Sequence, residues 1–157
     1  MKLGVSGHRW RDGADWTWVR ERLTDHIRSA GEVEGYTSLA PGADQIFAEI
    51  ILANKRELVA VIPVFGGHAE LEIGAKSEFD RFCRQAGRTI RINGDTPDAA
   101  FMAAGMFVVD ECDQMILVWD GKPSRGLGGT ADVAAYARKQ GKTGIILDPI
   151  ARRTAEL

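Results

Sequence analysis

The chain has 157 residues, of which 45% are hydrophobic and 27% charged, and its formal net charge at pH 7 is -2. These values are typical of a single globular domain and exclude collagen-like, low-complexity and disordered chains. The small negative charge argues against duplex nucleic acid as the main partner, and no apolar run approaches the ~18–20 residues that span a bilayer. The first ten residues lack the apolar core of a signal peptide, so we expect a cytoplasmic protein without a membrane partner.

The first third of the chain alternates a short apolar run with a helical repeat, twice. Residues 2–7 are typical of a strand that ends in a turn. The next segment, from Asp15 to a stop at Gly31, is an expected helix. Its apolar residues recur at helical spacing: Trp16, Val19, Leu23 and Ile27. A second strand begins at Tyr36 and leads through a Pro-Gly turn into a helix over residues 42–54.

The middle of the chain continues this alternation. Residues 58–65 form an apolar run of the buried-strand type, and residues 88–92 alternate like a strand near a sheet edge. Between them we expect a helix from about residue 68 to residue 85, and a Thr-Pro pair opens another over residues 96–111. The inward positions of the first of these helices are expected to be Leu71, Ala75, Phe79 and Phe82.

The last third contains two strands, a glycine-rich loop and a helix. Residues 114–120 form an apolar strand, and residues 130–139 form a helix that Gly141 caps. Residues 143–148 form the last strand, and the tail after it is expected to fray.

Six strands separated by five helices predict an α/β fold, with a single Rossmann-like, doubly wound domain over residues 1–150 and a C-terminal tail over residues 151–157. The sheet is expected to have about six, mostly parallel strands and helices on both faces, since near-continuous apolar strands are typical of doubly covered sheets. The two cysteines, Cys83 and Cys112, lie in helix-like patterns and no metal-ligand spacing repeats. We therefore expect neither a metal nor a resident cofactor.

Glycines and polar residues cluster after the expected strands, at one edge of the sheet. In open α/β sheets, ligands bind outside the carboxyl ends of the strands, where the strand order reverses. We therefore expect a binding site in the loops that follow the first, second and fifth strands. Its candidate residues are Ser6, Gly7, His8 and Arg9, then Gly42, Ala43 and Asp44, and finally Asp120 and Gly121.

The segment RGLGGT, residues 125–130, carries three glycines within four positions before a helix. Glycine is favoured where the backbone needs a positive φ or where another group comes close to it. A phosphate over the amides of residues 128–130, at a helix N-terminus, would be such a group. The candidate contacts are Gly126, Gly128, Gly129 and Thr130, with added charge from Lys122 and Arg125. The alternative is a plain connection in which Thr130 caps the helix.

Three stretches of the sequence resemble the SLOG superfamily. They are SGHR after the first strand, GAD at the second helix, and ILVWDG followed by GGTADVAAYARKQGK near the C-terminus. The resemblance extends over nearly the whole chain and is closest to the small YspA/YpsA-like members. It implies a Rossmann-like domain that binds a nucleotide or a nucleotide-derived ligand, with the Gly-Gly-Thr loop at the phosphate. Known members include the LOG phosphoribohydrolases, ligand sensors and the DprA DNA-processing proteins.

The sequence departs from the LOG pattern at the residues that carry LOG chemistry. LOG enzymes use a glutamate after the glycine loop together with an arginine from an earlier helix. At the glutamate's position this chain has Val133, and Asp132 comes one residue early, about 100° away around the helix. Ala104 and Gly105 stand where YspA-like relatives often carry Arg-Asn. The comparison favours nucleotide binding over LOG-type catalysis.

Two classes of function remain open. The first is a nucleotide-binding or sensor domain without turnover. The second is a small enzyme that cleaves or transfers the N-glycosidic bond of a nucleotide, with Asp44 or Asp120 as the catalytic carboxylate. A third, DprA-like handling of single-stranded DNA, is disfavoured by the acidic balance and the lack of an aromatic and basic stripe. The base, the number of phosphates and the pathway stay open.

The expected helix over residues 96–111 is apolar almost all round, which predicts burial on more than one side. The sheet covers one of its faces. A second copy of the chain would cover the other, so we expect a homodimer, with complete burial inside the monomer as the alternative.

Overall fold

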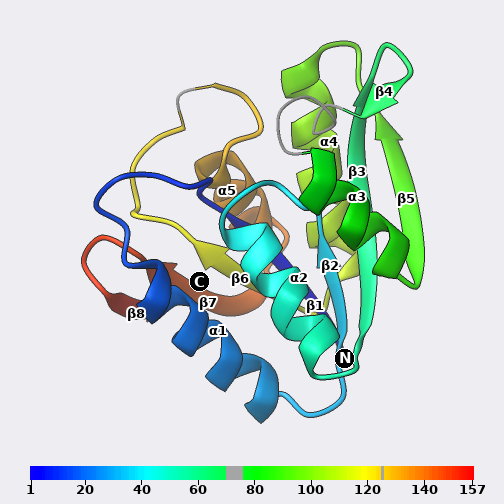
Figure 1. Ribbon diagram of the computed structural model, residues 1–157. Coiled ribbons are helices and arrows are strands. Elements are labelled where there is room, and N and C mark those ends of the chain that lie inside the picture. Colours follow the sequence, from blue (N-terminus) through cyan, green and yellow to red (C-terminus); the bar gives the residue numbers. More distant parts are fainter. Residues whose placement is uncertain (70–75, 125) are drawn as a thin grey trace.

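The structure is a computed structural model that describes residues 1–69, 76–124 and 126–157 (Figure 1). These residues form one eight-stranded sheet covered by five helices, which confirms the predicted doubly wound α/β fold and adds two strands to the expected six. Within them, no helix combines the length and the apolar composition that crossing a bilayer requires.

Six parallel strands form the centre of the sheet. In spatial order they are β5 (Arg88–Asn93), β3 (Glu57–Phe65), β2 (Glu34–Thr37), β1 (Lys2–Gly7), β6 (Gln114–Val118) and β7 (Thr143–Asp148). The chain builds outward from β1 to β5 and then returns to the other side of β1. The strand order therefore reverses between β1 and β6, which is where such sheets bind ligands.

Two short antiparallel strands extend the sheet beyond the prediction. β4 (His68–Ala69) turns back along the end of β3, so His68 belongs to a hairpin rather than to the helix expected from residue 68. Leu71 and Ala75 of that expected helix lie outside the described residues. β8 (Arg153–Glu156) pairs with β7, so this part of the tail joins the sheet instead of fraying. Neither strand carries an apolar alternation, because β4 has two residues and every residue of β8 is exposed.

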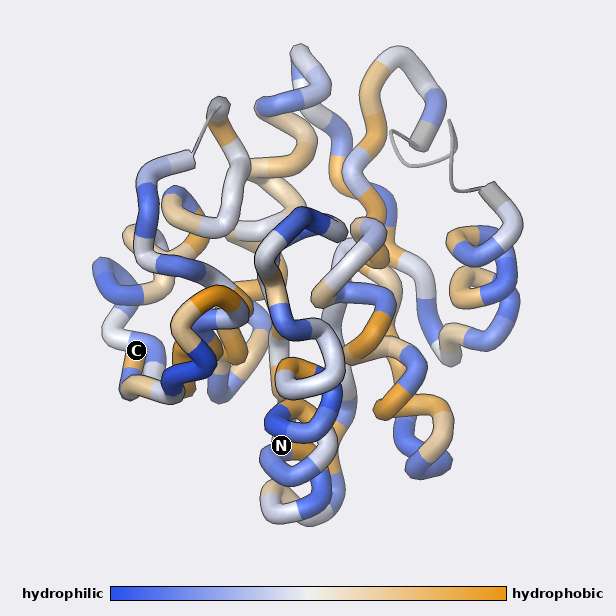
Figure 2. Tube along the Cα trace, turned by 60° about the vertical axis from the view of Figure 1, so that its left-hand side comes forward, coloured by the Kyte–Doolittle hydropathy of each residue, from blue (hydrophilic) through white to orange (hydrophobic). Residues whose placement is uncertain are grey.

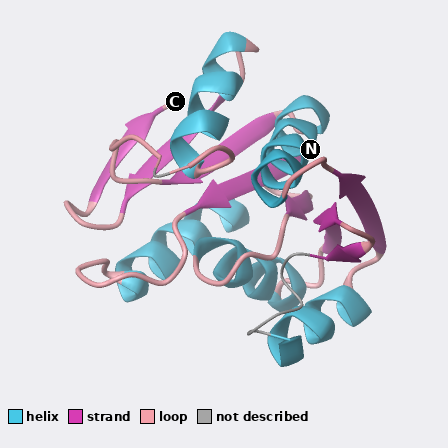
Figure 3. Cartoon of the chain, turned by 90° about the horizontal axis from the view of Figure 1, so that it is seen from above, coloured by secondary structure: helices cyan, strands magenta, loops and turns pink. Residues whose placement is uncertain are grey.

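Five helices cover the two faces of the sheet (Figures 1 and 3). On one face lie α1 (Trp16–Ser29), α2 (Ala43–Ala53) and α3 (Lys76–Gln85), and on the other lie α4 (Pro97–Glu111) and α5 (Thr130–Lys139). The connections between parallel strands thus place helices on both sides, as the doubly wound arrangement requires.

Residues of each central strand alternate between the two apolar cores. In β6, Ile116 and Val118 pack in the core beneath α1 and α2, whereas Met115 and Leu117 pack beneath α4 and α5. All four are fully buried, and burial of such a side chain contributes about 1.5–3 kcal/mol. Figure 2 shows the same separation along the helices, with hydrophobic segments toward the sheet and hydrophilic segments outside.

Side chains cap the starts of α1 and α4. The Asp15 carboxylate accepts a hydrogen bond from the Trp18 N–H at 3.0 Å, and the Thr96 hydroxyl accepts one from the Ala99 N–H at 3.1 Å. Pro97 occupies the first turn of α4, where a missing N–H costs nothing. In contrast, α2 and α5 begin at glycines and have no side-chain cap. Both of these helices begin at the carboxyl ends of the strands, and Asp44 and Thr130 in their first turns line the cleft described below.

The start of α2 packs directly against the loop that follows β1. Gly42 has a φ of 114° and a ψ of -127°, a conformation that is essentially restricted to glycine. A Cβ at this position would lie 2.5 Å from the His8 carbonyl oxygen and 2.8 Å from the Arg9 Cα. The Ala43 N–H donates to the same His8 carbonyl at 3.1 Å. Gly42 therefore holds α2 and the β1 loop together.

We expect Gly42→Ala to lower the free energy of unfolding by about 3 kcal/mol or more, because backbone strain and overlap with the β1 loop add. Gly31→Ala is the matched control, since Gly31 also has a positive φ, 73°, but no described atom lies within 4 Å of an added Cβ. Its cost should be about 1–2 kcal/mol. Urea denaturation measures both variants, and equal costs would mean that contact with the β1 loop is not what Gly42 maintains.

Candidate functional site

A cleft of about 950 Å³ opens at the carboxyl ends of β1, β2 and β6, above the reversal of strand order. The loops after β1 and β6 contribute to its walls, together with the first turns of α4 and α5. The predicted site residues that line it are Ser6, Gly7, His8, Arg9, Asp44, Asp120, Gly126, Gly128, Gly129 and Thr130. Loops that are far apart in the sequence thus meet at one site.

Three predicted site residues lie elsewhere. Gly42 and Ala43 are buried beneath the β1 loop, where they hold its backbone in place. Gly121 lies on a second, smaller cavity on the other side of the β6 loop. Arg125, which was expected to add positive charge, lies outside the described residues.

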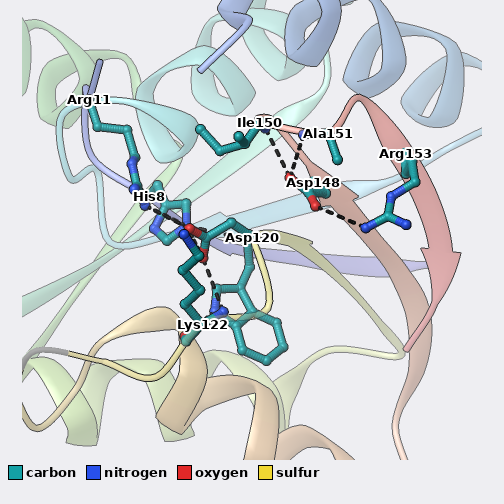
Figure 4. Close-up of polar contacts among 9 residues, drawn as sticks. His8, Arg11, Asp120, Lys122, Asp148, Ile150, Ala151 and Arg153 are labelled. Atoms are coloured by element: carbon teal, nitrogen blue, oxygen red, sulfur yellow. Dashed lines mark hydrogen bonds and ion pairs between the residues drawn. The ribbon is translucent and has the colours of Figure 1, made fainter. Parts of the chain in front are cut away.

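A cluster of three side chains joins the β1 loop to the β6 loop (Figure 4). The Asp120 carboxylate, only 3% exposed, accepts a hydrogen bond from Arg11 Nη1 at 3.1 Å on Oδ2, and its Oδ1 lies 3.1 Å from His8 Nε2. The Lys122 N–H donates to the same Oδ1 at 3.1 Å. Both oxygens are engaged, so Asp120 holds the two loops together.

The pKa values of His8 and Asp120 are both lowered from their ordinary values. Burial lowers the pKa of His8 below 6.5, although the hydrogen bond to Asp120 opposes the shift. Burial alone would raise the pKa of Asp120, but the Lys122 N–H, His8 and Arg11 together lower it below 3.8. At neutral pH the pair is therefore a neutral imidazole beside a carboxylate, with the charge of Asp120 offset by Arg11.

Asp44 is a buried carboxyl on the β2 side of the cleft, with 4% of its surface exposed. The Thr37 hydroxyl and the N–H groups of Ser38 and Ala40 donate to it. Burial raises the pKa of Asp44 to about 7 in spite of these bonds and of the nearby Arg9. A carboxyl that titrates near neutral pH inside a cleft is able to exchange a proton with a ligand.

The three glycines before α5 have different physical reasons. Gly128 has a φ of 86°, and a Cβ there would lie 2.8 Å from the backbone nitrogen of Met102, so the loop packs against α4. A Cβ on Gly129 would lie 2.5 Å from the Ser124 Oγ. Gly126 has ordinary space, since the nearest atom would be 3.5 Å away. Two of the three glycines therefore permit close packing within the protein.

The first residues of α5 line the cleft and keep free amides. The N-cap is Gly129, so Thr130 occupies the first helical position instead of capping the helix. The described residues provide no acceptor for the N–H groups of Gly129, Thr130 and Ala131. The Gly128 N–H donates to the Asp132 carboxylate at 3.0 Å. The amides open to an anion are therefore those of residues 129–131, one position later than predicted.

The floor of the cleft is apolar where LOG-type chemistry would need charges. Val133, at the position compared with the LOG glutamate, touches Gly105, where a Cβ would lie 2.7 Å from Val133 Cγ2. Val5 and Val108 also line the cleft beside them. Asp132, one residue earlier, is engaged with the backbone of the glycine loop. The position compared with the LOG glutamate is therefore apolar, and its surroundings are apolar as well.

The sequence interpretation missed several residues of the cleft. Arg11 follows the SGHR motif by two positions, and nothing in the sequence indicates its bond to Asp120. Phe101, on α4, lies beneath Arg9, with the guanidinium carbon 5.3 Å from the ring centroid. The topology is the signal that could have found Phe101, because the helix that crosses from β5 to β6 must pass over the reversal of strand order.

No protein-family model and no curated protein matches the chain. Among solved structures, it is similar to TM1055, a target of the Northeast Structural Genomics Consortium, with a TM-score of 0.61 and 14% identity over 93% of this chain and 73% of that one. It is also similar to DNA processing protein A (DprA) from Streptococcus pneumoniae, with a TM-score of 0.66 and 17% identity over 94% of this chain. The chain spans 50% of that DprA chain. At these identities the likeness shows the fold alone, and it agrees with the doubly wound α/β arrangement of the sheet.

The raised pKa of Asp44 predicts a pH-dependent stability. Between about pH 4 and pH 7 the folded protein retains a proton on Asp44 that the unfolded chain has lost, so unfolding becomes easier as the pH rises. The stability of the wild type relative to Asp44→Asn should therefore fall through this window, by at most about 1.4 kcal/mol per pH unit, and level off above it. Urea denaturation at several pH values measures the difference, and parallel profiles for the two proteins would contradict the raised pKa.

Proposed function

We propose that the cleft binds the phosphate of a nucleotide or a nucleotide-derived ligand, and that the protein acts as a binding or sensor domain. The observation that carries this proposal is a set of uncommitted positive groups around one cleft. The amides of residues 129–131 have no acceptor among the described residues, and a helix N-terminus attracts anions. Arg9 and Lys122 line the same cleft, and neither forms an ion pair within the described part of the chain.

The acidic residues near these groups support the same assignment. The charge of Asp120 is offset by Arg11, and Asp132 is bound to the Gly128 N–H. Asp44 has a pKa of about 7 and carries a full negative charge only above neutral pH. Asp12 and Asp98 also line the cleft, so the attraction for a phosphate comes from the amides of residues 129–131 together with Arg9 and Lys122.

The size and the lining of the cleft favour a nucleotide over inorganic phosphate. A volume of about 950 Å³ is at the upper end of ordinary small-molecule sites. The phosphate groups occupy one part of it, and the half-buried ring of Phe101 offers a surface for a base. The more specific part of the proposal, a likeness to the YspA-like members of the SLOG superfamily, rests on the sequence motifs.

A second candidate function is hydrolysis or transfer at the N-glycosidic bond of a nucleotide. Asp44 is the observation that favours it, because a buried carboxyl with a pKa of about 7 is suited to general acid–base work near neutral pH. Asp120 is less suited, since its two oxygens are already engaged by Arg11 and the Lys122 N–H. Val133 and Gly105 argue against the LOG route to this reaction.

The binding proposal is tested by melting the protein with inorganic phosphate, pyrophosphate, nucleoside monophosphates, cyclic nucleotides and NAD. A ligand at 100 times its Kd should stabilise the fold by about 2.7 kcal/mol. For a domain of this size that corresponds to a rise in Tm of about 5–10 °C. Release of free base in the same samples would favour the enzyme, and a Tm that no compound moves would reject phosphate binding.

We expect Gly129→Val to weaken binding far more than it lowers stability, because the side chain blocks the approach to the first amides of α5. The substitution also displaces Ser124, so the free energy of unfolding must be measured beside the Kd. Gly126→Ala is the matched control in the same loop, where a Cβ has room. The glycines would serve the fold and not a ligand if Gly129→Val unfolds the protein and Gly126→Ala also loses most of its affinity for the ligand.

We also propose that the protein forms a homodimer through α4. Ala99, Met102, Ala103 and Met106 are half-buried and belong to neither apolar core. Their spacing of three, four and seven places them on one stripe of the helix. Phe101 and Gly105, on the same helix, line the cleft, so a partner on this stripe would lie close to the ligand site.

Light scattering at micromolar concentration should give about twice the chain mass of 17.1 kDa. Met106→Glu places a charge at the C-terminal end of the stripe and should shift the mass to that of one chain without unfolding it. A wild-type mass near 17.1 kDa would reject the dimer.

A further inference from the structure

A second cavity, of about 570 Å³, lies behind the β6 loop, away from the α5 N-terminus. The end of β6, the last turn of α5, and strands β7 and β8 form its walls. Trp119 and Asp120 line both this cavity and the main cleft, so the β6 loop is the partition between them. We infer that this second cavity binds a small aromatic anion, meaning a planar ring that carries a phosphate or a carboxylate.

Trp119 provides a fixed aromatic wall. Its Nε1–H donates to the Lys122 carbonyl at 2.8 Å, which anchors the indole within its own loop. Its ring is also partly buried against the core beneath α4 and α5. A ring whose orientation is set in advance loses little conformational entropy when a second ring packs against it.

Two guanidinium groups line this cavity, and one of them, Arg138, lacks a carboxylate partner among the described residues. The guanidinium carbon of Arg138 lies 5.9 Å from the Trp119 ring centroid, and Arg138 forms no ion pair within the described residues. Arg153 has one acidic neighbour, with Nη2 3.7 Å from Asp148 Oδ2 in an exposed position. Two arginines on one cavity repel each other, and an anion placed near both removes that repulsion.

The carboxylates on the cavity do not cancel this charge. The negative charge of Asp120 is taken up by Arg11 on the main-cleft side. Asp148 uses Oδ1 to accept the N–H groups of Ile150 and Ala151, both at 2.9 Å, so its role is to hold the turn before β8 (Figure 4). With Asp120 paired to Arg11 and Asp148 to Arg153, the positive charge left on the cavity is that of Arg138.

These features select a ligand by two properties together. A guanidinium binds phosphate and carboxylate oxygens through paired hydrogen bonds, whereas the indole recognises a planar apolar face. Ile146 and Ala155 also line the cavity and offer apolar contacts to the ring. A neutral ring lacks the first property and a bare anion lacks the second.

The test uses phenyl phosphate and benzoate as probes and follows the indole N–H signals of the four tryptophans by NMR. Trp119→Phe assigns the Trp119 signal. We expect a saturable shift of that signal with phenyl phosphate, benzoate or both, at concentrations up to about 10 mM, because small fragments bind with roughly millimolar Kd. Benzyl alcohol, the neutral ring, should give none.

Charge variants at neighbouring residues distinguish binding in this cavity from a general effect of the protein's charge on the probe. Arg138→Gln and Arg153→Gln should each raise the Kd about tenfold. Arg152→Gln and Lys139→Gln remove the same charge from adjacent positions that do not line the cavity, and each should leave the Kd within about twofold. All four side chains are exposed, so the variants should fold.

Gly129→Val separates this inference from the proposed function, because it blocks the main cleft and leaves the second cavity intact. The inference is overturned by the absence of a saturable shift for both anions, by an equal response to benzyl alcohol, or by equal effects of Arg152→Gln and Arg153→Gln. It is also overturned if Gly129→Val abolishes the shift while Arg138→Gln does not, since the probe then binds in the main cleft.

Discussion

The parallel pairing of β1 with β6 is the constraint on which the rest of the structure depends. It joins residues 3–7 to residues 114–118, more than a hundred positions apart, and it creates the only reversal of strand order in the described sheet. Because the loops after these strands leave in different directions, a cleft must open between them. The glycines at 7 and 42 then allow α2 to approach the β1 loop closely, and Asp120 ties that loop to the one after β6. The cleft thus follows from topology, and its width from these few contacts.

The chemistry of the cleft depends on residues that the fold does not specify. The same topology supports binding proteins and enzymes, so function has to be argued from the site. Here Val133 and Gly105 pack together on the floor, and a charge placed there would be buried without a partner. The carboxyl that is poised for proton transfer, Asp44, lies instead on the β2 side among backbone donors. Asp44, with a pKa of about 7, is therefore the carboxyl on which the second candidate function rests.

Patterns of neighbouring residues in the sequence predicted most helices and strands. They could not predict which side chains from distant segments contact each other. The helical spacing of α1 and the Thr-Pro start of α4 depend on neighbouring residues, so both were predicted correctly. The candidate loops were predicted for the same reason, since each follows an apolar strand. The bond from Arg11 to Asp120 and the contact of Gly128 with α4 join residues far apart in sequence. The strand β8 was missed because an exposed edge strand carries no apolar period.

The two cavities lie on either side of the β6 loop, and the charged residues around that loop affect both of them. Each aspartate at the end of a central strand is satisfied within the protein, Asp120 by Arg11 and the Lys122 N–H, and Asp148 by the turn before β8. The cationic side chains that remain unpaired are therefore divided between the two sides of one loop, with Arg9 and Lys122 on one side and Arg138 on the other. These side chains are exposed, and an anion beside them gains an attraction that a neutral ligand lacks. The two proposed anion sites thus lie on either side of a loop whose own aspartate is engaged within the protein.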